Sequence, residues 1–289
     1  MIRRLAYVGL AAAALVVGAA FLLDRLYPPE LARLPAPVHL VRDQSGQPIA
    51  AFLGGSDQWT LPMDESAAPP VFRSLLIASE DRYFYDHPGV NPLAVLRATA
   101  QLLVHGHVIS GASTLAMQVA RLLHPRPRTL GAKIIEALRA LQLDGHFSHH
   151  RILSLWLDLA PFGSNVVGLK AASWMWFGKP PQALDPAEIA LLVALPERPE
   201  ALRPDRHPKA ARKARARLLA LAVRRHLLSP EAARLADREP LPRRLHSLPR
   251  AAPAALERIA LESNRGATPG DHGERAKPLG QTKESVFSQ

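Results

Sequence analysis

Hydrophobic residues first dominate the chain at positions 5–23, a 19-residue run without a charged side chain. This is close to the length that an α-helix needs to cross the hydrocarbon core of a bilayer, so the run predicts a transmembrane anchor. Arg3 and Arg4 precede it, and basic residues favour the cytoplasmic side. We therefore expect residues 1–4 to be a cytoplasmic stub and the chain beyond residue 23 to lie across the membrane.

A cleaved signal peptide is an alternative interpretation of the same run. Gly18, Ala19 and Ala20 supply small residues near a cleavage site, although the apolar core of a signal peptide is normally shorter. Under both interpretations the body of the protein faces an extracytoplasmic space.

The next segment, 24–70, is rich in proline and holds two short β-prone pieces. These pieces lie at 38–41 and 49–53 and flank a turn-like sequence at 43–46. The pattern predicts a linker that contains a short β-hairpin.

Apolar positions recur with helical spacing from 71 to 228, and turn residues divide this region into separate helices. The predicted starts are Asn91-Pro92, Ser148 and Asp185, and the predicted ends are Pro125 and Gly145. Asp185 opens a sequence typical of a capping box with proline at the first helical position. The body is therefore expected to be mainly α, followed by a largely disordered tail at 229–289.

The amino-acid composition excludes some kinds of site and some classes of partner. The chain has no cysteine, which excludes thiolate metal sites and cysteine nucleophiles. Its 36 Lys and Arg against 25 Asp and Glu give a net charge of +11, which suits partners that carry phosphate or an anionic membrane surface. Because nucleic acid is scarce outside the cytoplasm, we expect no nucleic-acid partner.

Three groups of polar residues are candidates for chemistry. Glu80 and Asp81 are adjacent carboxylates, and such neighbours point in different directions, so one can serve as a base while the other makes structural hydrogen bonds. A solvated helix end is the alternative interpretation of this pair. Ser113 or Thr114 can cap the helix that follows, and the N–H groups of a helix start can also bind an anion.

The third group contains Lys133 and Glu136, which lie one helical turn apart on the same face. By itself this spacing indicates a surface ion pair. Together the three groups form ordered strings, at Glu80–Gly89, Gly111–Gln118 with Arg121, and Arg128–Glu136.

These strings resemble the family 51 glycosyltransferases, the peptidoglycan polymerases found alone or in penicillin-binding proteins. The family signature reads E-D-x-x-F-x-x-H-x-G, G-G-S-T-x-x-x-Q and R-K-x-x-E, and the resemblance continues through 152–158, 162–163, 176–179 and 186–196 to Arg203-Pro204. It covers about residues 36–228 and looks most like the penicillin-binding protein 1C type. The sequence holds no S-x-x-K or K-T-G motif, so we expect no transpeptidase domain.

The resemblance implies a lysozyme-like, mainly α glycosyltransferase domain at 71–228 that polymerises lipid II with inversion and releases undecaprenyl diphosphate. It implies Glu80 as the general base and Glu136 as a second essential carboxylate. The substrate-binding positions that it implies are Asp81, His87, Ser113, Thr114, Gln118, Arg121, Arg128 and Lys133. A glutamate in a partly apolar cleft has a raised pKa, which suits a base.

The resemblance also implies partners and a location. Lipid II, the growing glycan strand and membrane lipid are the expected partners, with a separate transpeptidase and other cell-wall synthesis proteins as further ones. No cofactor is obligatory, and a divalent cation, Mg²⁺ or Mn²⁺, would be stimulatory only. The expected location is the inner membrane, with a single pass and the catalytic domain on the periplasmic side.

Several positions depart from the family pattern: Ala112, Ala132, His149, His150, Arg151, Asp158 and Glu197. They leave open a degenerate scaffold that binds lipid II without turnover. A lytic transglycosylase or lysozyme-like hydrolase is a second alternative, but such an enzyme has no use for cations at 121, 128 and 133. The apolar segment 102–109 is either a membrane-dipping segment or an ordinary core helix and turn.

Overall fold

The computed structural model describes residues 24–29, 39–42, 48–52, 58–61, 63–105 and 113–246. The described part is mainly helical, in agreement with the prediction for the body. Its α-helices are α2 (Pro70–Glu80), α3 (Pro92–His105), α4 (Leu115–Leu123), α5 (Leu130–His146), α6 (His149–Leu159), α7 (Leu169–Phe177), α8 (Pro186–Ala194), α9 (Pro208–Arg224) and α10 (Pro230–Arg238). Three short 3-10 helices are η1 (Glu65–Ala67), η2 (Pro181–Ala183) and η3 (Leu195–Glu197).

The helix starts follow the capping signals of the sequence. The Asp185 carboxylate accepts a hydrogen bond from the Glu188 N–H at 3.0 Å, and the Asp185 N–H donates to the Glu188 carboxylate at 2.9 Å. Ser148 caps α6 through the N–H of Arg151. Each cap satisfies an N–H that has no partner within its helix.

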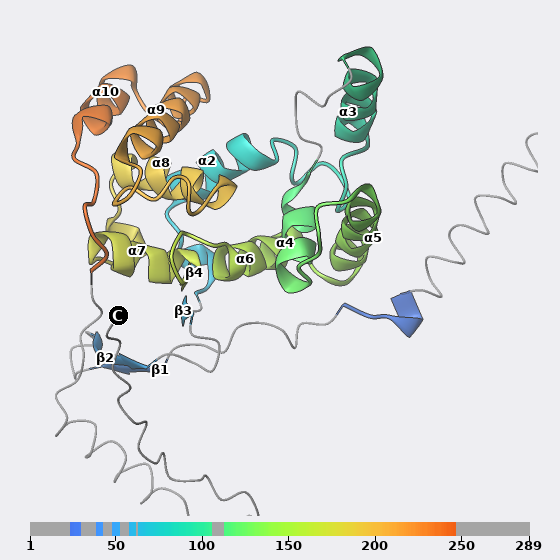
Figure 1. Ribbon diagram of the computed structural model, residues 1–289, viewed down its shortest axis with the longest axis horizontal. Coiled ribbons are helices and arrows are strands. Elements are labelled where there is room, and N and C mark those ends of the chain that lie inside the picture. The colour runs from blue at the N-terminus through green and yellow to red at the C-terminus, as the bar shows by residue number, and fades with distance from the viewer. Residues whose placement is uncertain are drawn as a thin grey trace, which may run out of the picture. The chain divides into compact units, whose positions relative to one another are not determined.

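The core is built around α8, whose residues from Ile189 to Ala194 are all buried. This helix packs against α2, α7, α9 and α10, while α4 packs against α5 and α6. In Figure 1, α7, α8, α9 and α10 lie on the left of the view and α4 and α5 on the right. Phe72, Leu75 and Leu76 form the buried face of α2, so this helix is anchored in the core along its length and ends at Glu80.

Two small sheets accompany the helices. Strands β1 (His39–Arg42) and β2 (Pro48–Phe52) form an antiparallel pair on the two β-prone segments. Strand β3 (Trp59–Thr60) lies parallel to β4 (Val166–Val167). The Trp59 N–H donates to the Asn165 carbonyl at 2.8 Å, which ties the segment before η1 to the chain between α6 and α7.

The helical body extends beyond residue 228, where the sequence predicted a largely disordered tail to begin. Helix α10 packs against α8 and α9, and the guanidinium of Arg215, only 1% exposed, donates to the carbonyls of Asp237 and Glu239. The His246 N–H donates to the Met175 carbonyl at 2.6 Å. The side chains that α10 buries, Ala233 and Ala236, are small, so the segment lacks the large apolar residues that mark a core helix in a sequence. Residues 247–289 lie outside the described part.

None of the helices in the described ranges combines the length and the apolar character of a membrane span. The predicted span, 5–23, lies outside those ranges. The segment 102–109 is described only as far as the end of α3.

Gly89 provides a test of how closely the loop after α2 approaches α5. A methyl group at this position would overlap the carbonyl group of Ala140 in the α5 backbone. We expect Gly89→Ala to destabilise the protein by about 1–3 kcal/mol, the usual range for overpacking, and to lower the midpoint of thermal unfolding of the full chain in detergent.

Gly145→Ala, in the last turn of α5, is the matched control, because a methyl group there meets nothing within 4 Å. It should leave the midpoint unchanged or raise it slightly. Equal midpoints for the two variants would contradict the close approach.

Candidate active site

Glu80 is the last residue of α2, and its side chain lines a cavity of about 560 Å³. Gln118, one turn into α4, donates from its amide nitrogen to the Glu80 carboxylate at 3.0 Å. The Trp156 indole N–H donates to the Gln118 amide oxygen at 2.9 Å. Because an indole nitrogen can only donate, it fixes which end of the Gln118 amide faces Glu80.

Burial raises the pKa of the Glu80 carboxyl above its ordinary value. The hydrogen bond from Gln118 lowers this pKa, and the nearby charge of Glu197 raises it, but loss of water contact is the largest influence. The direction matches the expectation for a base in a partly apolar cleft.

The same cavity wall also carries positive charge. Lys133 donates to the Ser113 hydroxyl at 2.6 Å and to the Glu136 carboxylate at 3.1 Å. This confirms the predicted contact between Lys133 and Glu136 on one face of α5. An ammonium group has three donors, so these two bonds leave one for a ligand.

Arg121 and Arg128 line the same cavity. Arg121 is in the last turn of α4, and Arg128 lies two residues before α5 begins. Within the described ranges neither guanidinium forms a hydrogen bond or ion pair. The cavity wall therefore offers positive charge that no residue of the described ranges neutralises, an arrangement suited to an anionic group such as a diphosphate.

Seven of the ten sequence-predicted site residues line this one cavity: Glu80, Ser113, Gln118, Arg121, Arg128, Lys133 and Glu136. The remaining lining residues are Thr129, Leu130, Ala132, Pro196 and Glu197. Residues from four separate elements, α2, α4, α5 and η3, thus converge on a single space.

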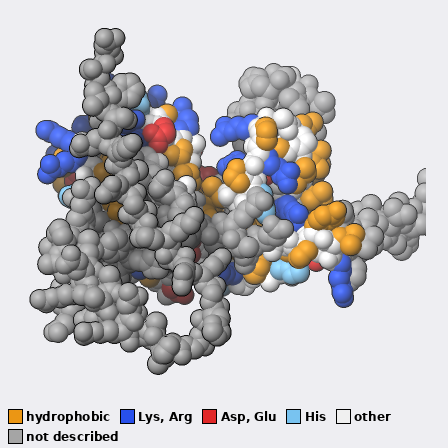
Figure 2. Space-filling view, turned by 60° about the horizontal axis from the view of Figure 1, so that its bottom comes forward, with side chains coloured by type: hydrophobic (Ala, Val, Ile, Leu, Met, Phe, Trp, Pro, Cys, Tyr) orange, Lys and Arg blue, Asp and Glu red, His pale blue; other side chains and the backbone are white. Residues whose placement is uncertain are grey.

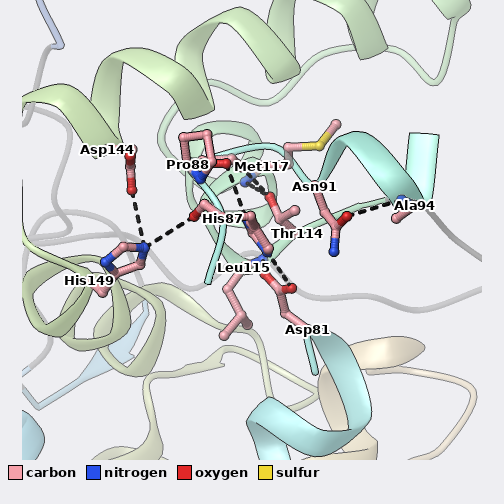
Figure 3. Close-up of polar contacts among 11 residues, drawn as sticks. Asp81, His87, Pro88, Asn91, Ala94, Thr114, Leu115, Met117, Asp144 and His149 are labelled. Carbon is pink, nitrogen blue, oxygen red and sulfur yellow. Dashed lines mark hydrogen bonds and ion pairs between the residues drawn. The ribbon is translucent and has the colours of Figure 1, made fainter. Parts of the chain in front are cut away.

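The other three predicted residues, Asp81, His87 and Thr114, do not line the main cavity. All three are buried: Asp81 and His87 lie in the loop between α2 and α3, and Thr114 is the N-cap residue of α4 (Figure 3). The Asp81 carboxylate contacts the His87 ring at 2.8 Å and accepts from the Leu115 N–H at 3.0 Å. Asp81 and Thr114 also line a smaller cavity of about 260 Å³ next to Glu80.

Thr114 joins this loop to the start of α4. Its hydroxyl donates to the Gly89 carbonyl at 2.5 Å and accepts from the Met117 N–H at 3.2 Å. The second bond is a helix cap, as the sequence predicted for Ser113 or Thr114. Through these contacts Asp81, His87 and Thr114 hold the backbone next to two residues of the main cavity. Glu80 precedes Asp81 in the chain, and Ser113 precedes Thr114.

His149, one of the departures from the family pattern, also holds this loop. Its ring nitrogen donates to the His87 carbonyl at 3.3 Å and lies 3.3 Å from the Asp144 carboxylate near the end of α5 (Figure 3). The adjacent His150 contacts Glu65 at 3.1 Å. Both side chains therefore have structural contacts at the start of α6.

The remaining departures have different surroundings. Asp158 accepts from the Met63 N–H at 3.0 Å, and burial raises the pKa of its carboxyl. Ala132 is a buried part of the cavity wall, whereas Arg151 is exposed and Ala112 lies outside the described residues.

The sequence did not reveal the surroundings of Glu197. In the structure this residue lines the cavity and pairs with Arg217 of α9. The two residues are 20 positions apart, so no short motif contains both. Within the described part of the chain no three acidic or histidine side chains are placed to hold a metal ion.

Comparisons with known proteins show which family this chain resembles. A family model described as Transglycosylase matches residues 45–223. Penicillin-binding protein 1C of Escherichia coli (strain K12) is 43% identical over 230 residues, which cover 80% of this chain and 30% of that protein. Penicillin-binding protein 1A of Aquifex aeolicus (strain VF5) is 36% identical over 166 residues, which cover 57% and 23%.

Among solved structures, penicillin-binding protein 1A from Haemophilus influenzae aligns with a TM-score of 0.41 and 16% identity. The alignment covers 80% of this chain and 24% of that one. The present chain thus spans less than a third of the length of these relatives.

The role of Thr114 can be tested through stability. Thr114→Val keeps the shape of the side chain but removes both hydrogen bonds of its hydroxyl, so we expect a loss of about 1–2 kcal/mol, typical of a lost helix cap. Thr114→Ser keeps the hydroxyl and is the matched control. Thermal unfolding of the full chain should separate the two variants, and equal stability would show that the hydroxyl does not hold the loop.

Proposed function

The chain belongs to the transglycosylase family, and from this premise we propose that it is a peptidoglycan glycosyltransferase that polymerises lipid II. The observation that carries the proposal is the composition of one cavity. A half-buried carboxylate with a raised pKa, Glu80, shares this space with the cations Arg121, Arg128 and Lys133. Glycosyl transfer from a lipid diphosphate requires both a base and a cationic site for the leaving group.

In the proposed reaction, the Glu80 carboxylate takes the proton from the 4-hydroxyl of the acceptor sugar. The resulting oxygen nucleophile attacks the anomeric carbon of the lipid-linked donor strand. The bond between that carbon and the diphosphate oxygen breaks, and the configuration inverts. Gln118 holds the Glu80 carboxylate in place through the 3.0 Å hydrogen bond, which orients it before substrate arrives.

The leaving group is undecaprenyl diphosphate, which departs with negative charge already spread over its phosphates. Positive charge therefore stabilises it more effectively than a proton donor does. Arg121 and Arg128 supply guanidinium groups that suit phosphate oxygens, and the remaining ammonium hydrogen of Lys133 supplies a further donor. Glu136 keeps Lys133 in place through their 3.1 Å contact.

Exposed apolar side chains support contact with a membrane, where a lipid-linked substrate resides. Leu93 and Leu96 on α3 and Leu130, Ile134 and Leu138 on α5 are exposed. Figure 2 shows hydrophobic and Lys or Arg side chains side by side on the part of the visible surface that these helices form. Apolar groups next to cations fit an anionic lipid surface, and we propose the periplasmic face of the inner membrane as the location.

Incubation of the full chain with purified lipid II tests the proposed function against its two alternatives. Glycan polymer is the expected product. Binding without product would indicate a scaffold, and cleavage of preformed glycan would indicate a lytic enzyme; either result would overturn the proposal.

Glu80→Gln tests the assigned base. Because the amide cannot accept the proton, we expect polymerisation to slow by at least about 100-fold, with thermal unfolding close to that of the unmodified chain. Glu231→Gln, an exposed position in the first turn of α10, is the control and should polymerise at the normal rate. A Glu80→Gln variant with normal activity would remove this residue from the mechanism.

A further inference from the structure

Glu197 is a second carboxylate in the wall of the main cavity. It is the last residue of η3, directly after Pro196, and both line the space that Glu80 enters from α2. Its carboxylate receives two hydrogen bonds from one guanidinium: Arg217 donates from Nη1 at 3.1 Å and from Nη2 at 2.5 Å. Such a bidentate contact fixes the orientation of both side chains.

This ion pair contributes little to holding the fold together. The side chain of Glu197 is 38% exposed and that of Arg217 is 53% exposed. Ion pairs with this much solvent contact typically stabilise a protein by about 0–1 kcal/mol. A neutral residue at position 197 would therefore cost the fold little stability. The effect of Glu197 is expected instead on Glu80, which lines the same cavity.

The charges of the pair act on Glu80 in opposite directions. A negative charge close to a carboxyl group disfavours its ionisation, and a positive charge favours it. Accordingly Glu197 raises the pKa of Glu80 and Arg217 lowers it, in addition to the larger effect of burial. Arg217 both neutralises much of the Glu197 charge and acts on Glu80 itself.

We propose that Glu197 is a positioning residue of this glycosyltransferase site: its carboxylate, held in the cavity wall by two hydrogen bonds from Arg217, sets the electrostatic surroundings of the base Glu80. The inference rests on the proposed function. The pair would let Glu80 bind a proton strongly and still be ionised at the working pH. Glu197 with its charge partly neutralised by Arg217 changes the proton affinity of Glu80 less than an unpaired carboxylate would.

Other charged groups around the cavity are common to every comparison below and stay unchanged in it. From α4 and α5 they are Arg121, Lys133 and Glu136, with Arg128 in the segment before α5. The adjoining smaller cavity, which Glu80 also lines, adds Asp81 and Arg82 from the loop after α2 and Arg97 from α3. None of these groups is altered in the variants compared below.

The test compares the pH dependence of lipid II polymerisation in the full chain with that of Glu197→Gln and Arg217→Gln. Activity requires ionised Glu80, so the rate falls as the pH drops through its pKa. Glu197→Gln removes a negative neighbour, lowers this pKa and should move the acidic limb of the profile to lower pH. Arg217→Gln leaves Glu197 without its partner, raises the pKa and should move the limb to higher pH.

The double variant should lie between the two single variants. Arg212→Gln is the matched control, because it removes an exposed positive charge from the same helix and should leave the limb in place. Loss of activity in both single variants without opposite shifts of the limb would assign the pair a merely structural role and overturn the inference.

A readout without substrate separates this inference from the proposed function. Carbon NMR of glutamate-labelled protein follows the Glu80 carboxyl directly, with its signal identified by its absence in Glu80→Gln. If the Glu80 titration shifts in opposite directions in Glu197→Gln and Arg217→Gln, but the unmodified chain does not polymerise lipid II, the electrostatic coupling is supported and the proposed function is refuted. Normal polymerisation with an unshifted Glu80 titration would refute the coupling and leave the function standing.

Discussion

The burial of the Glu80 carboxyl at the end of α2 is the constraint on which the site depends. Helix α2 is held by Phe72, Leu75 and Leu76 in the core, so its last residue has little freedom to turn toward solvent. Loss of water contact raises the pKa of the carboxyl, and the Gln118 amide, oriented by the Trp156 indole, donates a hydrogen bond to its charged form. A carboxyl with these properties binds a proton more strongly than a fully exposed glutamate does.

The site joins two groups of packed helices. Glu80, Glu197 and Arg217 come from the group around α8, while the amide of Gln118 and the cations come from α4 and α5. The loop after α2 bridges the groups through Asp81, His87 and Thr114, whose polar atoms bind within the protein. Because these contacts cross between the groups, substitutions in the loop should change the separation of base and cations as well as stability.

The departures from the family pattern differ in their physical meaning. His149 contacts the loop that follows Glu80, so it takes part in the support of the site. Glu197 adds a charge to the cavity, but Arg217 accompanies it. At these two positions, the contacts of the departing side chain are with residues outside the motif that contains it.

The sequence alone determined the features that act over a few residues. The caps at Ser148 and Asp185 follow from hydrogen bonds within one helical turn, and the Lys133–Glu136 contact follows from helix geometry. The ordered motifs also predicted seven residues of the main cavity. Only the tertiary structure decided that Asp81 and His87 turn inward, that Trp156 orients Gln118, that Arg217 meets Glu197 and that Arg215 anchors the chain beyond α10. These contacts join side chains brought together by the packing of whole helices, and no local pattern of hydrophobic and polar residues records which side chains that packing makes neighbours.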